Sequence, residues 1–275
     1  MNATIPSPYP EGSTIGPDLT VKNGRLHFAG VELLRLMTEP LPGRAEPLGS
    51  PLEVVFLPKI ADQIRQMRLW FAEAMAEIGY PAGFEYAYAS KANSSEEVTR
   101  TALAAGAHYE TSSATDVEIV RYCLKHGLMP PDRWAINNGF KTPGSDYTKK
   151  LIELRADGFT HVMPVFEDVD ELEPFIESGL SFQVGLRQKI DKHARTVDAI
   201  EGSDIRFGMA GPALREAARR IAAAPNLTLV MYHAMQSDAA GDPERWLAGF
   251  RSGMGIYAAL AKAHPSLHIY NWGGG

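Results

Sequence analysis

Short apolar runs alternate with helical stretches over most of this 275-residue chain, and this alternation limits the possible folds more than any other feature. Strands separated by single helices are typical of parallel βαβ units. The expected strands are FEYAYAS, AHYETSS, RWAINN, THVMPVF, SFQVGLR, LTLVMYH and SLHIYNW. Seven such runs favour an α/β fold of the (β/α) barrel type. An open, doubly wound sheet remains an alternative, because the alternation does not reveal whether the sheet closes.

The first 50 residues have a different pattern from the rest of the chain. Two short alternating runs flank Asn23-Gly24, a pair preferred in two-residue hairpin turns of type I′. Residues 38–52 form a connector rich in proline and glycine. We therefore predict two domains, an antiparallel β segment over residues 1–50 and a barrel over residues 51–275.

The barrel region begins with a long helix and is shorter than a complete barrel. From about residue 58 the helical spacing predicts one apolar face, made of Ile60, Ile64, Met67, Trp70, Phe71 and Met75. Residues 84–275 fall short of the roughly 250 residues of a complete eight-stranded barrel. The sequence also stops at three glycines directly after an expected strand. We therefore expect a (β/α)8-type TIM barrel that is incomplete at its C-terminal end.

Charge and cysteine content narrow the function classes. The formal net charge is -6 and the basic residues are scattered, which argues against a nucleic-acid surface. No signal peptide is recognisable, and no apolar run reaches the length of a membrane span, so we expect a cytoplasmic protein without membrane partners. The single cysteine, Cys123, excludes an internal disulfide and a multi-thiolate metal site. Its place within a helix predicts a small core residue.

Chemically useful side chains stand at the C-terminal ends of the expected strands, where barrel enzymes build their active sites. They are Lys91, Glu110, Ser112, Ser113, Asn138, Lys141, Arg187, His233 and the three terminal glycines. Common zinc, calcium and nucleotide motifs are absent from the sequence, so no metal site is expected. A partly desolvated lysine at a strand end, such as Lys91, is a good nucleophile toward a carbonyl. From chemistry alone, however, a surface lysine in a loop is the more common case.

The segment YAYASKANSSEEVTRTALAAGAHYETSSATDVEIV resembles the fold-type III decarboxylases, which depend on pyridoxal 5′-phosphate (PLP). This family of ornithine, diaminopimelate and biosynthetic arginine decarboxylases has a Tyr-Ala-x-Lys-Ala-Asn strand end, then a helix, an acidic residue and serines. The resemblance covers roughly residues 50–275 and is most specific around residues 86–118. It implies that Lys91 forms an aldimine with PLP. It also implies that the N-terminal hairpin belongs to a β domain built from both chain ends.

The resemblance assigns further residues to the cofactor. Glu110 matches an acidic residue close to the cofactor, and glutamate there resembles the arginine decarboxylase branch. Ser113 matches a serine of the same loop, although it fits equally well as the N-cap of the next helix. Arg187, in GLRQKI, would lie beside the cofactor ring, and otherwise would pair with a loop carboxylate. INNGFKT resembles an Asn-Gly-Tyr-Lys stretch of arginine decarboxylases with Lys141 near the site, but a plain turn explains it equally well.

The last two strands complete the expected cofactor site. His233 matches a histidine that stacks on the cofactor ring, whereas without the resemblance a core histidine is the better interpretation. The family continues His-x-Gly-Ser, but this chain reads His-Ala-Met-Gln-Ser, so the phosphate contact shifts to Ser237 or is lost. The terminal glycines match a loop whose N–H groups surround the phosphate. They are Gly273, Gly274 and Gly275.

The resemblance therefore implies an enzyme, a carboxy-lyase that decarboxylates a basic amino acid such as arginine, ornithine or diaminopimelate in amino-acid metabolism and polyamine biosynthesis. Its partner is this small-molecule substrate, and the full-length protein is expected to be a homodimer. In the family, the carboxylate that binds the pyridine nitrogen and a phosphate-binding tyrosine follow the glycine loop. We therefore expect this chain, truncated before the C-terminal β domain, to be a poor or inactive catalyst.

Three alternatives remain open. An alanine-racemase-like enzyme shares the barrel and the lysine, and its second base would lie outside this sequence. A PLP-binding carrier protein also has a barrel and a lysine, but it lacks the β domain that the hairpin indicates. A catalytically inactive relative is consistent with the departure from the family pattern after His233.

Overall fold

A computed structural model describes residues 14–16, 18–189, 207–235 and 242–274 of the chain. It divides into two compact units, Met1–Lys59 and Ile60–Gly275, and each is described here by itself. The division falls within helix α2 (Leu57–Ile78). The domain boundary that the sequence places after residue 50 stays a prediction.

The first unit holds a small antiparallel sheet with the strand order β1-β2-β3-β4. The elements are β1 (Thr14–Gly16), β2 (Leu19–Lys22), β3 (Arg25–Phe28), β4 (Val31–Glu32) and α1 (Leu33–Thr38). Asn23 and Gly24 form the loop between β2 and β3, with φ angles of 51° and 65°. Type I′ turns need a positive φ at both positions, so the predicted hairpin is confirmed. Ala29 and Gly30 form a second such loop, which the sequence did not reveal because alanine seldom adopts a positive φ.

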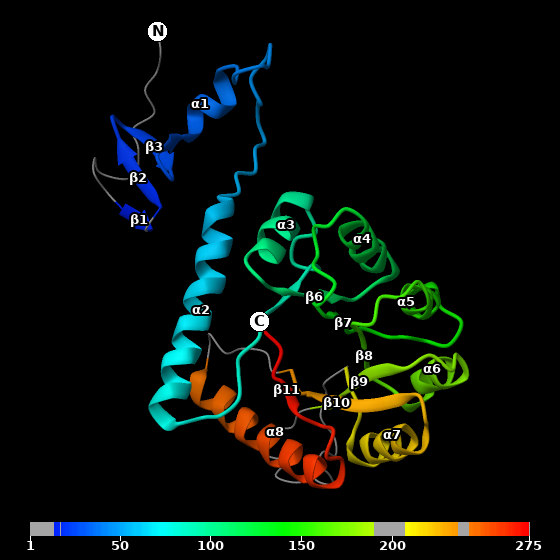
Figure 1. Cartoon of the computed structure of the whole chain (residues 1–275). Coiled ribbons are helices and arrows are strands. Elements are labelled where there is room, and N and C mark those ends of the chain that lie inside the picture. Colours follow the sequence, from blue (N-terminus) through cyan, green and yellow to red (C-terminus); the bar gives the residue numbers. More distant parts are fainter. Residues whose placement is uncertain (1–13, 17, 190–206, 236–241, 275) are drawn as a thin grey trace. The chain divides into compact units, whose positions relative to one another are not determined.

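The second unit is built on a seven-stranded sheet in which every neighbouring pair is parallel. The strand order is β11-β10-β9-β8-β7-β6-β5. The strands are β5 (Ala87–Ala89), β6 (His108–Thr111), β7 (Ala135–Asn137), β8 (Val162–Phe166), β9 (Phe182–Arg187), β10 (Leu227–His233) and β11 (Ile269–Asn271). Figure 1 shows these strands inside a ring of helices. The curled sheet is an incomplete (β/α) barrel, as predicted, with β5 and β11 at its two edges.

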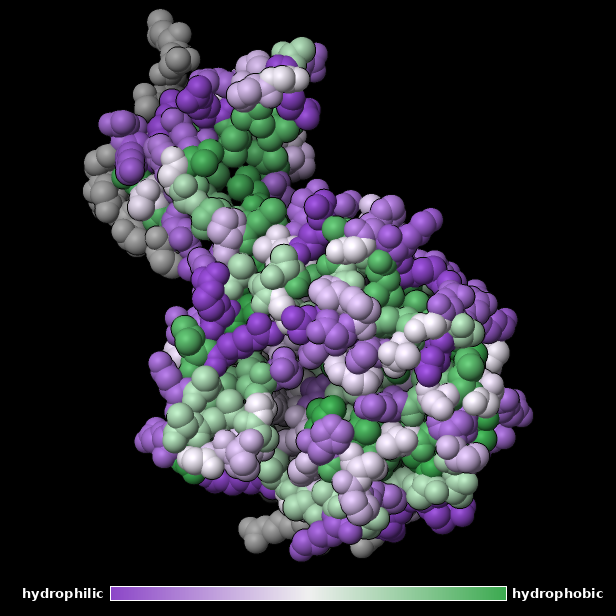
Figure 2. Space-filling view, in the orientation of Figure 1, coloured by the Kyte–Doolittle hydropathy of each residue, from purple (hydrophilic) through white to green (hydrophobic). Residues whose placement is uncertain are grey.

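Helices follow the strands and cover the outer face of the sheet (Figure 1). They are α3 (Glu96–Ala104), α4 (Ala114–Lys125), α5 (Asp146–Ala156), η1 (Val169–Leu172), α6 (Glu173–Glu177), α7 (Gly211–Ala223) and α8 (Pro243–Ala263). After β8 the chain forms a 3-10 turn followed directly by a short α-helix. Pro174 lies in the first turn of α6, and its missing N–H favours a new helix start. Figure 2 shows hydrophilic residues around the outer rim of this unit. No helix in the described ranges has the length and apolar character needed to cross a bilayer.

The sheet has an apolar core on each face. The outer core, between strands and helices, includes Tyr109, Phe166 and Cys123, and the last is 3% exposed, which confirms the predicted core cysteine. The inner core, inside the curl of the sheet, consists of Ile136, Met163, Val165, Val230 and Met231. It is closely packed, because a Cβ added to Gly185 would lie 3.1 Å from both Met231 Cβ and Val165 Cγ2.

Helix α2 carries an aromatic stack that joins the two edges of the sheet. The Phe71 ring stacks on Phe84 at a centroid distance of 4.0 Å and on Trp272 at 5.5 Å. Phe84 precedes β5 and Trp272 follows β11 directly. Trp70 was expected on the apolar face but is 59% exposed. Successive residues of an α-helix are about 100° apart, which places Trp70 beside the apolar face that contains Ile64 and Phe71.

Candidate active site

The carboxyl ends of β5 to β11, here called the strand mouth, bring several predicted site residues to one rim of the curled sheet. Glu110 is the register partner of Ile136, which belongs to the inner core. Arg187 is the register partner of His233, which is in turn the partner of Asn271. Register partners in a sheet point to the same face. Arg187 also lies two residues beyond Gly185, whose position faces the inner core, so these side chains line the inner side of the mouth.

Lys91 stands in the turn that follows β5, two residues beyond the strand. Ser90, the preceding residue, is fixed to the neighbouring strand, because its N and its Oγ donate to the Glu110 carbonyl at 3.4 and 3.1 Å. Lys91 itself is exposed, so the expected partial desolvation is wrong. The reason is that β5 is an edge strand, which leaves one flank of the turn uncovered.

Asp116 holds the turn after β5 to the turn after β6. Its carboxylate accepts hydrogen bonds from Ser90 Oγ at 3.0 Å, from Ser112 N at 2.8 Å and from Ser113 Oγ at 3.0 Å. Ser113 Oγ also accepts from Asp116 N as the N-cap of α4. The N-cap interpretation of Ser113 is thus confirmed, and its contact with a cofactor stays a prediction.

The carboxyl group of Glu110 is affected by burial and by charges at the strand mouth. Burial raises its pKa above the ordinary value. A hydrogen bond from Asn138 and the positive charges of Lys91 and Arg187 oppose this rise in the Glu110 pKa. By strand register Glu110 and Arg187 line the inner side of the mouth, and Lys91 follows β5 at the same rim.

Arg187 is held on several sides at the end of β9. Its Nη1 donates to Glu167 Oε1 at 2.9 Å, and its Nη2 contacts Met235 Sδ at 3.7 Å. The Phe207 ring centre lies 4.9 Å from its guanidinium carbon, a cation–π distance. The pairing with a loop carboxylate that the sequence left open is therefore present.

His233 is 2% exposed at the end of β10. Burial, followed by the charge of Arg187, lowers its pKa to about 3, so the imidazole is neutral near pH 7. His233 Nδ1 lies 3.0 Å from the Asn271 carbonyl oxygen, which only accepts hydrogen bonds. Nδ1 therefore carries the proton, and Nε2 is free of one.

The glycine loop begins directly after β11. Gly273 has a φ of +72° and donates its N–H to Asn271 Oδ1 at 2.8 Å. A Cβ at this position would lie 2.7 Å from Met235 Cγ, so glycine is required here on two grounds. A Cβ at Gly274 would meet nothing within 4 Å, so this part of the loop faces open space. Ser237 and Gly275 lie outside the described residues.

Three buried charged residues at the mouth complete the arrangement, and the sequence analysis missed two of them. Glu167 follows β8 and Glu171 lies in η1, and both are 3% exposed. Lys141, noted from the sequence, is 0% exposed, and its Nζ lies 3.7 Å from Glu171 Oε2. Glu167 stands directly after the expected strand THVMPVF, and this position at a strand end is the signal that the sequence offers.

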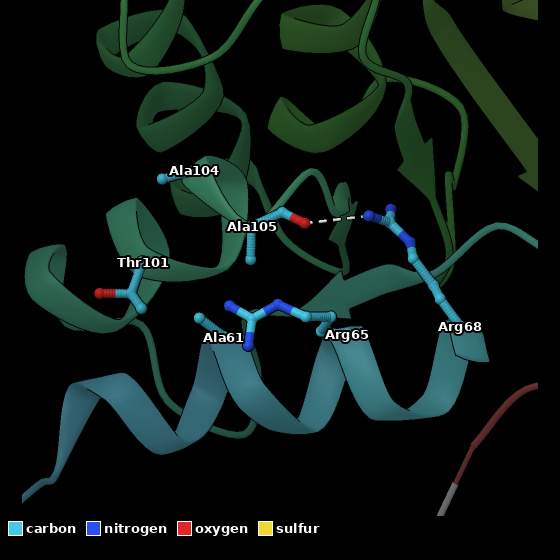
Figure 3. A pocket seen from close by; sticks show the side chains of 6 residues that line it. All are labelled: Ala61, Arg65, Arg68, Thr101, Ala104 and Ala105. Atoms are coloured by element: carbon cyan, nitrogen blue, oxygen red, sulfur yellow. Dashed lines mark hydrogen bonds between the residues drawn. The ribbon is translucent and has the colours of Figure 1, made fainter. Parts of the chain in front are cut away.

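A separate pocket of about 500 Å³ lies between α2 and α3 (Figure 3). Arg68 crosses it and donates to the carbonyls of Ala105 and Gly106, which precede the amino end of β6. This pocket is therefore at the other end of the strands from the mouth. Among the residues that the structure describes, no three His, Cys, Asp or Glu side chains gather into a metal cluster.

These observations define a class: a parallel barrel with a lysine, a carboxyl group, an arginine, a neutral histidine and a glycine loop on one rim. The set fits PLP, since the exposed Lys91 amine is accessible to an aldehyde and a neutral His233 stands at the same rim. The model of the family described as "Pyridoxal-dependent decarboxylase, pyridoxal binding domain" matches residues 60–275. The chain belongs to this family, and its cofactor is pyridoxal 5′-phosphate.

Individual relatives agree with this assignment. Biosynthetic arginine decarboxylase from Gloeobacter violaceus is 25% identical over 241 residues, which cover 83% of this chain and 36% of that protein. The enzyme of the same name from Alkalilimnicola ehrlichii is 26% identical over 188 residues, 66% of this chain and 27% of that one. This chain thus spans little more than a third of such relatives.

Solved structures share the fold. The biosynthetic arginine decarboxylase SpeA from Campylobacter jejuni has a TM-score of 0.71 at 18% identity and is matched over 94% of this chain and 43% of its own. Diaminopimelate decarboxylase from M. jannaschii, solved with L-lysine, has a TM-score of 0.72 at 19% identity over 94% of this chain and 57% of its own. At these identities the likeness concerns the fold alone.

Proposed function

We propose that this chain is the cofactor-binding part of a PLP-dependent decarboxylase that acts on a basic amino acid, with Lys91 as the residue that holds the cofactor. The proposal is supported by the register that places Glu110, Arg187 and His233 on the inner side of one strand mouth, with Lys91 in the turn after β5 at the same rim. Similarity to arginine decarboxylases supports arginine as the first substrate to test.

PLP, when bound, supplies the electron sink that accepts the electron pair left behind by departing CO₂. The Lys91 amine is the nucleophile that would hold its aldehyde carbon. Within the described residues this amine has no hydrogen bond or ion pair, and an exposed, unpaired amine is accessible to an incoming aldehyde. The Ser90 and Asp116 contacts keep the backbone beneath it in place.

Glu110 would hold a proton, and His233 would pack against the cofactor ring. The raised pKa of Glu110 means that its carboxyl group keeps a proton to a higher pH than an ordinary glutamate. His233 would pack a flat and uncharged imidazole against the cofactor ring, because its pKa of about 3 keeps it neutral. Arg187 would lie at the edge of the same ring, with its charge balanced by Glu167.

The phosphate would lie against the backbone of Gly273 and Gly274, since the loop there approaches without side chains. Gly275 and Ser237 extend this part of the proposal, and Ser113 would contribute its hydroxyl beyond its role as N-cap. Assembly as a homodimer and a cytoplasmic location remain predictions.

The central test is the attachment of PLP. Wild-type protein mixed with PLP should develop a yellow absorbance band, and Lys91→Ala should lack it, because Lys141, the other lysine described at the mouth, is buried and paired with Glu171. Borohydride reduction followed by peptide mass mapping should place the pyridoxyl group on Lys91. Release of CO₂ from arginine, ornithine and diaminopimelate then ranks the substrates.

Lys125→Ala is the matched control, since Lys125 is an exposed lysine at the end of α4. It should keep both the absorbance band and the label. A band of full strength in Lys91→Ala, or a label that maps mainly to other lysines, would contradict the proposal.

A further inference from the structure

The strand mouth contains a chain of buried charges, and the proposed function gives no role to its Lys141 and Glu171. It runs from Lys141 through Glu171 and Glu167 to Arg187. The first three are 0%, 3% and 3% exposed. Burial of ion pairs rarely adds stability compared with apolar residues of the same size, so such a chain indicates a task other than holding the fold together.

Glu167 fixes one edge of the Arg187 guanidinium. Its Oε1 accepts hydrogen bonds from Arg187 Nη1 and from Gly139 N, both at 2.9 Å. The Glu167 and Arg187 side chains are 0% and 12% exposed. The Phe207 ring covers the guanidinium at 4.9 Å. A carboxylate at the edge and a ring nearby leave the guanidinium little freedom to rotate.

Glu171 and Lys141 in turn hold Glu167. Glu171 Oε2 accepts from the backbone N of Glu167 at 2.9 Å, and Glu171 Oε1 accepts from the backbone N of Lys141 at 2.7 Å. Lys141 Nζ donates to the Asn137 carbonyl at 3.2 Å and pairs with Glu171 at 3.7 Å. One carboxylate therefore ties the loop after β7 to the loop after β8, which carries Glu167.

The orientation of Arg187 matters to the rest of the mouth. It is the register partner of His233, and its positive charge lowers the pKa of both His233 and Glu110. A rotated guanidinium would change the surroundings of both groups at once.

We infer that Glu167 is a positioning residue, which aims the Arg187 guanidinium at the bound cofactor, and that the Glu171–Lys141 pair keeps Glu167 in place. The inference rests on the proposed function, because it requires PLP at the strand mouth. It assigns Glu167 no contact with substrate or cofactor, and its effect passes through Arg187.

The test uses Glu167→Gln protein titrated with PLP. The dissociation constant for PLP should rise about tenfold and the visible absorbance band should shift, because Arg187 loses its fixed direction. Arg187→Met should give the same shift. The double variant should differ no more from wild type than Arg187→Met does, since two changes along one path are not additive.

Glu173→Gln is the matched control, since it removes a carboxylate paired with Arg220 among the outer helices. It should leave affinity and band unchanged. Glu167→Asp keeps the buried charge but shortens its reach, so it should give an intermediate shift even where Glu167→Gln folds poorly. Additive effects in the double variant, or wild-type bands in both Glu167 variants, would overturn the inference. If wild-type protein shows no Lys91-dependent band, the proposed function fails and this inference falls with it.

Discussion

The two sides of the strand mouth differ in how firmly their charged groups are held. On the β5 side Lys91 is exposed, and its amine has no polar partner within the described residues. On the β8 to β10 side Glu167, Arg187 and His233 are largely buried and hydrogen-bonded. The difference teaches that one rim serves two needs. A group that forms and breaks bonds must be able to move, whereas groups that orient a cofactor must stay in place.

The largest effect on activity should come from a change on the β5 side, at Lys91. Lys91→Arg keeps the positive charge but removes the nucleophilic amine, because a guanidinium stays protonated. We expect the yellow band with PLP to be lost, and any decarboxylation by the protein to fall on the order of 10⁴-fold or more. A CO₂ release assay measures this loss, and borohydride should leave no pyridoxyl label at position 91. Lys149→Arg, at an exposed lysine of α5, should behave as wild type, and a labelled, active Lys91→Arg protein would contradict the comparison.

The buried, hydrogen-bonded charged groups of the mouth should contribute more to the free energy of unfolding than the exposed Lys91. Lys141→Met leaves Glu171 buried without its cation, which should lower the free energy of unfolding by about 3–5 kcal/mol. Lys91→Met should change it by no more than about 0.5 kcal/mol, because that side chain is exposed. Urea unfolding without PLP measures both. Equal losses in the two variants would show that the two sides do not differ as described.

The last effect depends on pH and concerns His233. Its folded-state pKa of about 3 lies below the ordinary 6.5, so the fold favours the neutral imidazole. As pH falls from 6.5 toward 3, the unfolded chain gains a proton that the folded chain does not. Stability should therefore fall in this window by up to about 1.4 kcal/mol per pH unit from this group.

His233→Gln should remove that part of the slope when unfolding is measured across the same window. His268→Gln, at an exposed histidine, should keep it. Identical slopes in wild type and His233→Gln would show that His233 does not resist protonation in the folded protein.

The sequence predicted the strands and most of the rim, because the position of a residue after a strand follows from hydropathy and turn signals alone. Lys91, Glu110, Arg187 and His233 were found in this way. The pairing of Glu167 with Arg187 joins β8 to β9, and it depends on register and curl, which local patterns do not contain. The exposure of Lys91 depends on β5 being an edge strand. The exposure of Trp70 was not predicted, because a periodic pattern does not define the edge of an apolar face. The 3-10 turn of η1 was not predicted, because such a pattern does not show where a helix restarts at a proline.

The two edge strands, β5 and β11, are connected through side chains. Lys91 follows β5 and the glycine loop follows β11, so they stand at the two opposite edges of the sheet. In the described residues the rings of Phe71, Phe84 and Trp272 bridge these two edges, and no backbone hydrogen bonds pair β5 with β11. Ring contacts of this kind contribute about 0.5–1.5 kcal/mol each beyond the area they bury. Phe71 of α2 contacts both rings, so this helix links the edge that leads to Lys91 with the edge that leads to the glycine loop.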